Sequence, residues 1–123
     1  MQYLVWGKVK VGRKKGKLLG FPTVNIALHK NIPEGVYVSK VKIDSFWFDA
    51  LTFVGAAKTF GEKNKKVESY ILNFNQNIYE KWITTCMLKR VRGNIKFNSE
   101  KKLVEQIRKD LTVANNFFAK IKQ

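Results

Sequence analysis

Alternation of apolar and polar side chains over short runs is the feature that most constrains the fold of this chain. Successive side chains of a β-strand point to opposite faces, so such a run buries one face and exposes the other. Residues 3–11 alternate in this way, and five further short runs with strand-like composition follow over residues 24–28, 36–43, 46–54, 67–74 and 81–91. Turn residues separate them, among them Asp44-Ser45 and Asn75-Gln76-Asn77. The pattern predicts an antiparallel β-sandwich or barrel.

The hydrophobic period changes near the C-terminus. Asn98-Ser99 can cap a helix, and helical spacing then relates the apolar residues Leu103, Val104, Ile107, Leu111, Ala114 and Phe118. Lysines and arginines occupy much of the other side. We predict one amphipathic helix over about residues 99–121 that covers a wall or an end of the β structure.

Length and composition limit the class of protein. With 123 residues, 45% of them hydrophobic, the chain fits a single domain over residues 1–123. No apolar run approaches the roughly 20 residues that span a bilayer, and the first residues lack the pattern of a secretory signal. One cysteine excludes an intramolecular disulfide, and one histidine argues against a Cys/His zinc site. We expect a cytoplasmic enzyme or binding domain with no membrane partner.

The charge is strongly positive, with a formal net value of +15. It permits nucleic acid, an anionic membrane surface or a small polyanion such as a nucleotide as a partner. Lysines spread over a solvated surface account for it equally well. Position is more informative, because the first acidic residue is Glu34 and the first quarter of the chain is therefore electropositive.

A glycine- and lysine-rich segment lies in this quarter. It contains Gly12, Gly16, Lys17 and Gly20 and continues into Phe21-Pro22-Thr23-Val24-Asn25. Glycines let a backbone approach a ligand, and lysines supply positive charge. Thr23 and Asn25 supply neutral oxygens for a Mg²⁺ ion held mainly by phosphates. The spacing is not that of a Walker loop. The alternative is a loop that enters a strand with its polar groups satisfied, and the residues alone leave both interpretations open.

Glu68 stands at the start of an otherwise apolar strand face that it shares with Tyr70, Leu72 and Phe74. Such a carboxylate is either a rim residue neutralised by a lysine or a desolvated group. Desolvation raises the pKa of a carboxyl toward the value that suits a general base. Further along, Tyr79 and Arg92 can stack on or clamp a planar ligand, although aromatics in strands also serve as core.

Taken in order, these motifs resemble the riboflavin kinase (flavokinase) family. The resemblance spans nearly the whole chain and is carried by Gly12 to Asn25, Pro33-Glu34-Gly35-Val36-Tyr37, the run 67–74 with Glu68, Ile78-Tyr79, and Arg92 with Lys96-Phe97. It implies a mainly β fold, a six-stranded antiparallel Greek-key barrel with a C-terminal helix. It also implies transfer of the γ-phosphoryl of ATP to the 5′-hydroxyl of riboflavin, which yields FMN and uses Mg²⁺ or another divalent metal.

The resemblance implies a role for each matching residue. Thr23 and Asn25 correspond to residues at the metal and phosphates, and Glu68 to the general base for the ribityl hydroxyl. Tyr79 falls near the nucleotide, and Arg92 falls near the flavin. The segment that closes over the nucleotide phosphates comprises Gly12, Gly16, Lys17 and Gly20, followed by Phe21 and Pro22.

The chain also departs from the family pattern. Lys58 replaces the proline of a second Pro-Thr-Phe, and Glu80 replaces a glycine after the Ile-Tyr pair. Val91-Arg92-Gly93-Asn94 stands where Leu-Arg-x-Glu is usual. The last change falls on the flavin side, whereas the metal and base positions are retained. Many bacterial relatives carry an additional adenylyltransferase that makes FAD. The 123 residues leave no room for it, so we expect a chain that stops at FMN or an excised domain.

Two other functions remain open from the sequence. A basic β-barrel can bind single-stranded nucleic acid through lysines and exposed aromatics, but this does not account for Thr23, Asn25 and Glu68. A family member without catalysis could bind flavin or nucleotide as a regulatory module, which fits the changes at Lys58 and Asn94. We favour an active kinase with riboflavin and ATP as partners, expect a monomer, and disfavour nucleic acid as the main partner.

Overall fold

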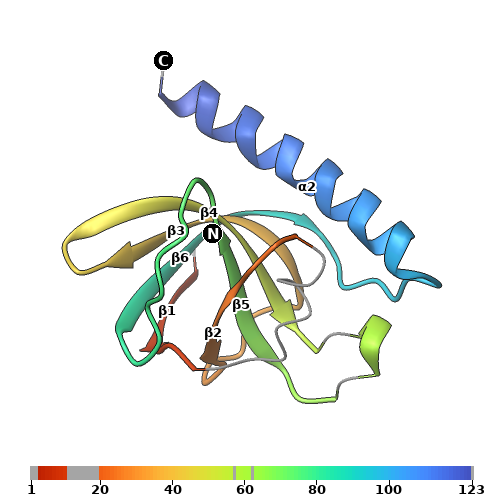
Figure 1. The fold of residues 1–123 in the computed structure, drawn as a ribbon, viewed down its shortest axis with the longest axis horizontal. Coiled ribbons are helices and arrows are strands. Elements are labelled where there is room, and N and C mark those ends of the chain that lie inside the picture. Colours follow the sequence, from red (N-terminus) through yellow and green to blue (C-terminus); the bar gives the residue numbers. More distant parts are fainter. Residues whose placement is uncertain (1–2, 11–19, 57, 62, 123) are drawn as a thin grey trace.

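The computed structural model describes residues 3–10, 20–56, 58–61 and 63–122, and in these residues six antiparallel strands form a nearly closed barrel (Figure 1). The strands are β1 (Tyr3–Lys8), β2 (Val24–Ala27), β3 (Gly35–Ile43), β4 (Phe46–Gly55), β5 (Lys66–Ile71) and β6 (Trp82–Arg92). Their order is β1-β6-β3-β4-β5-β2. Since β6 returns to lie beside β3, the strands β3 to β6 make a Greek key. The prediction of a mainly β Greek-key barrel is confirmed.

The chain that follows β1 brings the two edge strands of the barrel together. Lys10 forms an isolated antiparallel bridge with Asn25 of β2, in which Lys10 N donates to Asn25 O at 2.8 Å. On the other side, Val9 N donates to Lys81 O at 2.8 Å, and Glu80 N donates to Val9 O at 3.0 Å. These bonds place Asn25 at the seam where the barrel closes.

Strand alternation fills the interior of the barrel. The buried inward-facing apolar residues are Val5, Ile26, Tyr37, Val41, Ile43, Ala50, Val54, Val67, Ile71, Ile83 and Met87. Burying a side chain of this size contributes about 1.5–3 kcal/mol. Three hydroxyls are buried among them and satisfy one another, because Thr52 Oγ1 lies 2.6 Å from Ser39 Oγ and 2.8 Å from Ser69 Oγ.

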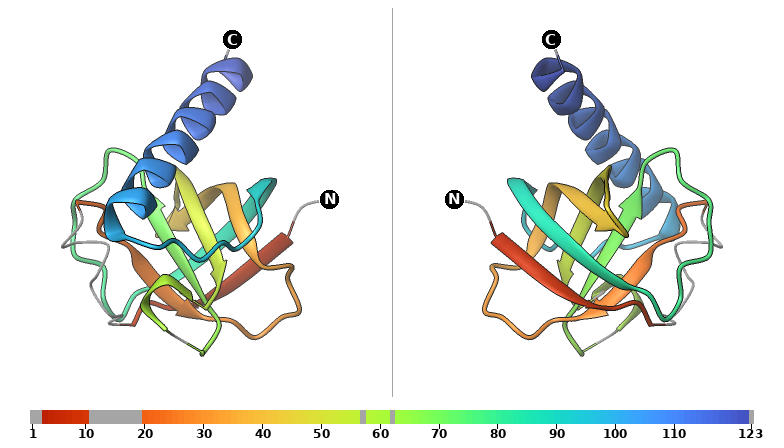
Figure 2. Two further views of the ribbon diagram at one scale, coloured as in Figure 1. Left: turned by 90° about the vertical axis from the view of Figure 1, so that its right-hand side faces the viewer. Right: turned by 90° about the vertical axis from the view of Figure 1, so that its left-hand side faces the viewer.

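Helix α2 (Glu100–Ile121) follows the barrel and lies across the outer face of β3 and β4, as Figures 1 and 2 show. Ser99 caps it, with Ser99 Oγ accepting from Lys102 N at 3.2 Å. Ala114 and Phe118 pack with outward-facing apolar residues of β3 and β4, namely Val36, Val38 and Leu51. The predicted helix over residues 99–121 is confirmed as a cover for the barrel wall. In the described ranges, no helix combines the length and apolarity that crossing a membrane requires.

Two strands are shorter by two or more residues than their sequence patterns predict. β1 ends at Lys8, and Val11 lies outside the described residues. β5 ends at Ile71 because Asn73 adopts a φ of 56°, a left-handed conformation that breaks the strand. Leu72 therefore packs in the cluster under α2, and Phe74 packs edge-on against Phe48, with ring centroids 5.1 Å apart. A short 3₁₀ helix, η1 (Lys58–Phe60), connects β4 toward β5.

Candidate functional site

A row of paired residues on the outer face of the barrel contains three of the residues with a predicted function, two of them as direct neighbours. Asn25 of β2 is paired with Glu68 of β5, and Glu68 is paired with Phe53 of β4. Phe53 is paired in turn with Val36 of β3, and Val36 with Arg92 of β6. Directly paired side chains share a face, with their Cβ atoms about 4.5–5.5 Å apart. Glu68 is thus the immediate neighbour of Asn25 in this row, which we call the Asn25–Arg92 row.

Asn25 carries an unsatisfied polar atom in this row. The residue is only 8% exposed, and among the described residues its Oδ1 has no hydrogen-bond partner. A buried amide oxygen is rarely left in this state, because its desolvation costs about 1–3 kcal/mol. A neutral oxygen beside a carboxylate is a donor set that suits Mg²⁺. Half-buried Thr23 stands directly before β2. Asn25 Oδ1 thus has the chemistry of a divalent-metal ligand, and Thr23 carries a second neutral oxygen two residues earlier in the chain.

Glu68 is half-buried and lies 2.8 Å from an ammonium group, measured from its Oε1 to Lys66 Nζ. Lys66 stands two residues earlier on the same face of β5. This pair corresponds to the rim glutamate neutralised by a lysine that the sequence left open. A carboxylate so placed can still accept a proton from a bound hydroxyl, and its neighbour Asn25 puts it beside the candidate metal position.

Arg92 is held by a carboxylate of the helix. Arg92 Nε donates to Asp110 Oδ1 at 3.1 Å and Oδ2 at 3.0 Å, and Nη2 lies 2.9 Å from Oδ2. Gln106 Nε2 also donates to Asp110 Oδ1 at 3.0 Å. Asp110 is 1% exposed, so the pair is largely removed from water. The structure therefore uses Arg92 to join the end of β6 to α2.

The sequence analysis did not identify Asp110. The available signal was its spacing of four residues from Ala114 and eight from Phe118, which places a carboxylate in the buried stripe of the helix. A lone acidic residue in an apolar stripe usually has a buried partner, because an unpaired charge there is costly. The identity of that partner depends on where β6 ends, which the stripe does not reveal.

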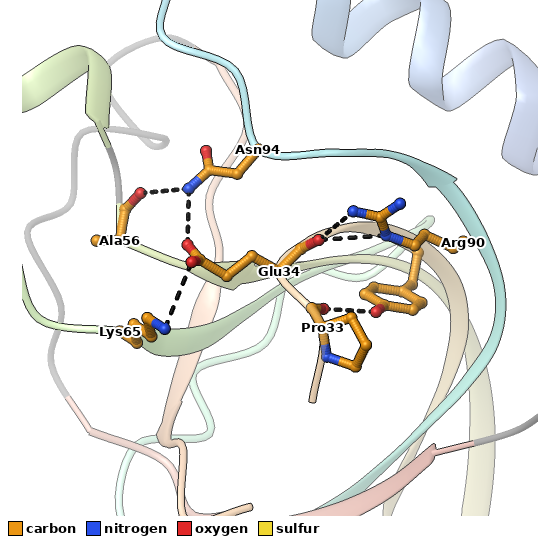
Figure 3. Close-up of polar contacts among 7 residues, drawn as sticks. Pro33, Glu34, Ala56, Lys65, Arg90 and Asn94 are labelled. Carbon is orange, nitrogen blue, oxygen red and sulfur yellow. Dashed lines mark hydrogen bonds and ion pairs between the residues drawn. The ribbon is translucent and has the colours of Figure 1, made fainter. Parts of the chain in front are cut away.

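A second polar cluster surrounds Glu34, in the turn before β3, as Figure 3 shows. Glu34 Oε1 accepts from Asn94 Nδ2 at 3.0 Å, and Lys65 Nζ lies 3.4 Å from Glu34 Oε2. Asn94 Nδ2 donates also to Ala56 O at 3.0 Å, and Arg90 Nη2 donates to Glu34 O at 2.6 Å. The hydrogen bond from Asn94, aided by Lys65, lowers the pKa of Glu34 against an opposing effect of burial. The cluster ties together the ends of β4 and β6 and the entry to β3.

This cluster gives a physical reason for the departure at position 94. Asn94 donates to a carboxylate here, whereas a glutamate at the same position would bring two carboxylates into hydrogen-bond distance. The close packing also explains two glycines. A Cβ on Gly55 would lie 2.5 Å from Glu34 Oε1, and one on Gly35 would overlap Arg92 O. Lys58, the other departure nearby, is exposed at the start of η1.

Tyr79 and its neighbour lie where the barrel closes. Tyr79 is exposed, and its backbone N donates to Asn77 Oδ1 at 3.0 Å. Glu80, which donates to Val9 O, adopts a φ of 71°. Glycine adopts this left-handed conformation without strain, which accounts for the glycine that the family pattern favours here. Tyr79 thus lies close to the chain that leads into the glycine-rich segment.

Of the remaining predicted residues, Gly20, Phe21 and Pro22 lie shortly before β2. Phe21 packs edge-on against Tyr70 of β5, with ring centroids 5.8 Å apart. Pro22 is exposed, and Gly20 is exposed with a φ of 92°. Gly12, Gly16 and Lys17 lie outside the described residues.

Comparison with known proteins agrees with the fold and identifies the family. The flavokinase (riboflavin kinase) family model matches residues 1–118, and the chain belongs to this family. A bifunctional riboflavin kinase/FMN adenylyltransferase of Buchnera aphidicola is 36% identical, over 94% of this chain and 39% of that protein. An RNA-binding riboflavin kinase of Bacillus subtilis is 30% identical, over 93% of this chain and 51% of that protein. The riboflavin kinase structure of Trypanosoma brucei shares the fold, with a TM-score of 0.66 and 22% identity over 97% of this chain and 81% of that chain. This chain spans about two fifths of the length of the bifunctional relative.

Proposed function

We propose that this chain is a riboflavin kinase that transfers the γ-phosphoryl of ATP to the 5′-hydroxyl of riboflavin and yields FMN. The observation that carries the proposal is the pairing of Asn25 with Glu68 on neighbouring strands, where Asn25 Oδ1 has no hydrogen-bond partner within the described part of the chain. Phosphoryl transfer needs a metal-nucleotide site and a proton acceptor close together, because the attacking hydroxyl must approach the γ-phosphorus. The family match over residues 1–118 supports the same reaction.

Asn25 Oδ1 and the Thr23 hydroxyl would hold the Mg²⁺ of the nucleotide. When bound, Mg²⁺ neutralises phosphate charge and orients the transferred group. The protein's own contribution is to place two neutral oxygens at a seam that the Lys10–Asn25 bridge holds closed. Around this position, the nucleotide phosphates would lie against Gly12, Gly16, Lys17, Gly20, Phe21 and Pro22, with Tyr79 beside them.

Glu68 would accept the proton of the 5′-hydroxyl as the phosphoryl group transfers. Lys66 holds the carboxylate at its place in the row. Arg92 would act on the flavin side, and Asp110 would be a positioning residue because it fixes the Arg92 guanidinium by three contacts of 2.9–3.1 Å. We further propose that the protein acts as a cytoplasmic monomer.

The direct test is FMN formation from riboflavin, ATP and Mg²⁺, followed by chromatography. Glu68→Gln should lower kcat by about 10²- to 10⁴-fold, since it removes the proton acceptor while retaining the shape of the side chain. Glu80→Gln is the matched control, because Glu80 also pairs with a lysine, at 3.1 Å from Lys8 Nζ, but lies apart from the row. Its turnover should equal that of the wild type.

The possible failures are distinguishable. If no nucleoside triphosphate yields FMN, the kinase function is wrong. If riboflavin binds, by quenching of its fluorescence, but is never phosphorylated, the chain is a regulatory flavin-binding module. If Glu68→Gln turns over like the wild type, the base assignment alone is wrong.

A further inference from the structure

The outer face of the barrel carries three exposed tryptophans at the strand ends away from the Asn25–Arg92 row. Trp6 of β1 is paired with Thr84 of β6, Thr84 with Lys42 of β3, and Lys42 with Trp47 of β4. Two positions further along, and so on the same face, Lys8 is paired with Trp82. We call the surface formed by Trp6, Lys8, Lys40, Lys42, Trp47 and Trp82 the tryptophan face.

This face points away from the core and is not covered by the helix. Its members alternate along their strands with buried residues, such as Val5 before Trp6 and Ile83 after Trp82. Trp6, Trp47 and Trp82 are 46%, 48% and 67% exposed. In the right-hand view of Figure 2, β1 and β6 lie in front and α2 lies behind them. Large aromatics gathered at an exposed surface indicate a binding partner.

Lysines are interleaved with these rings. Lys42 stands in the row between Thr84 and Trp47, and its Nζ lies 5.9 Å from the centre of the Trp47 ring. Lys30 Nζ lies 4.3 Å from the centre of the Trp6 ring. Such cation–π contacts hold a positive charge beside an aromatic surface without burying either.

The acidic residues around the face are neutralised by lysines of their own. Glu80 Oε2 lies 3.1 Å from Lys8 Nζ, and Asp44 Oδ2 lies 3.0 Å from Lys81 Nζ. Asp49 is paired with Lys40 across the sheet. Its Oδ2 lies 2.5 Å from Nζ of Lys122, the residue that caps the C-terminus of α2. The charges of Lys30, Lys40 and Lys42 therefore add to one another, and the face is electropositive.

The combination of exposed tryptophans and lysines favours single-stranded nucleic acid over a protein as the partner. The buried centres of protein interfaces are depleted in lysine, so a protein partner fits this face poorly. Single-stranded nucleic acid presents unstacked bases, which stack on aromatic rings, and phosphates, which pair with lysines, at alternating positions along one chain. Trp6 and Trp82 lie on adjacent strands at diagonal positions, about 7–8 Å apart at their backbones. Two neighbouring bases can therefore each meet a ring.

We propose that the tryptophan face binds single-stranded nucleic acid, with bases stacked on Trp6, Trp47 and Trp82 and phosphates on Lys40 and Lys42. On β3 and β6 this face lies at the Lys42 and Thr84 ends, whereas the Asn25–Arg92 row lies at the Val36 and Arg92 ends of the same strands. On these two strands the surfaces are therefore separate, and they come nearest at the seam, where Lys8 stands two residues from Lys10, the partner of Asn25. Binding here adds to the proposed kinase function and does not depend on it.

The experiment measures the anisotropy of fluorescently labelled dT20 and rU20 titrated with the full chain at 50 and 200 mM NaCl. If Lys40 and Lys42 neutralise two phosphates, affinity should fall about 7-fold between these salt concentrations. Lys40→Glu/Lys42→Glu should remove most binding and flatten the salt dependence. Trp82→Ala and Trp47→Ala should each weaken binding about 5- to 100-fold. FMN formation should be unchanged in all three variants.

The matched control is Lys101→Glu/Lys109→Glu, which makes the same change of charge at two exposed positions of α2. If it weakens binding as much as Lys40→Glu/Lys42→Glu, diffuse charge and not this face holds the strand, and the proposal is overturned. Equal or tighter binding of a 20-base-pair duplex overturns it as well. So does binding to phosphatidylserine vesicles with none to either oligonucleotide, which would identify a membrane surface.

Discussion

Strands β3 and β6 have opposite surroundings at their two ends. Near Val36 and Arg92, the outer face lies under α2 and beside the Glu34 cluster, so it is apolar or has its charges paired. Near Lys42 and Thr84, the same strands face solvent with lysines and tryptophans. Alternation decides which face of the sheet a residue occupies. Whether α2 covers that face decides whether the residue packs inside the protein or meets solvent. We refer to these as the covered end and the open end.

The largest expected difference between the two ends concerns charge pairs. Asp110→Ala at the covered end should lower the free energy of unfolding by about 3–5 kcal/mol, because it leaves the largely buried Arg92 guanidinium without its carboxylate. Lys122→Ala is the control, since it removes an even shorter pair with Asp49 but its side chain is 63% exposed. It should cost less than about 1 kcal/mol. Urea unfolding followed by circular dichroism measures both, and similar losses would refute the comparison.

A second test separates function from stability within the Asn25–Arg92 row. Asn25→Ala removes a buried oxygen that has no partner among the described residues, so the unfolding free energy without ligand should be unchanged or higher. The Mg²⁺ concentration for half-maximal FMN formation should rise at least about tenfold. The thermal shift produced by Mg²⁺-ADP should shrink in parallel. A variant with lower stability and an unaltered Mg²⁺ response would show that Asn25 is structural.

The Glu34 cluster at the covered end should make stability depend on acid pH. The Asn94 hydrogen bond lowers the pKa of Glu34 below its ordinary value of 4.5. A group whose pKa is lowered in the folded state stabilises the fold above its unfolded pKa and loses that contribution as the pH falls through the folded pKa. Asn94→Ala should therefore cost about 1 kcal/mol at pH 7 and progressively less below about pH 4.5.

Urea unfolding at pH 7, 5, 4 and 3 measures this dependence. Asn64→Ala, at an exposed bend, is the control and should show no such trend. A constant difference between Asn94→Ala and the wild type at all four pH values would mean that Asn94 acts through packing and not through the Glu34 carboxylate.

The smallest effect is expected at the open end. Glu80→Gly should raise the free energy of unfolding by about 0.5–1 kcal/mol, because glycine adopts the φ of 71° without strain. The lost contact with Lys8 joins two exposed groups and contributes little. Asn73→Gly, at a φ of 56°, should gain less because asparagine tolerates this conformation. Thermal unfolding of both variants measures these changes in stability. Destabilisation by Glu80→Gly would show that the Lys8 contact outweighs the strain.

The sequence predicted the strands well because each depends on alternation over a few residues. Val5 and Trp6 fall on opposite faces as their neighbours require. The end of β5 was missed, because a left-handed residue such as Asn73 interrupts an apolar pattern without changing it. The site was only partly predictable. Asn25 and Glu68 were each chosen for their chemistry, but their pairing is a matter of register between distant strands.

By itself, the sequence determined which residues face inward, where the helix lies along the chain, and which side chains have the chemistry of a phosphoryl-transfer site. These properties follow from local periodicity and residue type. Only the tertiary structure decided which of those side chains meet. Barrel closure brought Asn25 to Glu68, the docking of α2 gave Arg92 its carboxylate, and the absence of that helix from the Lys42 end of the described barrel left three tryptophans in water. The physical reason is that cross-strand pairing and helix docking depend on contacts between residues far apart in the chain, which no local pattern records.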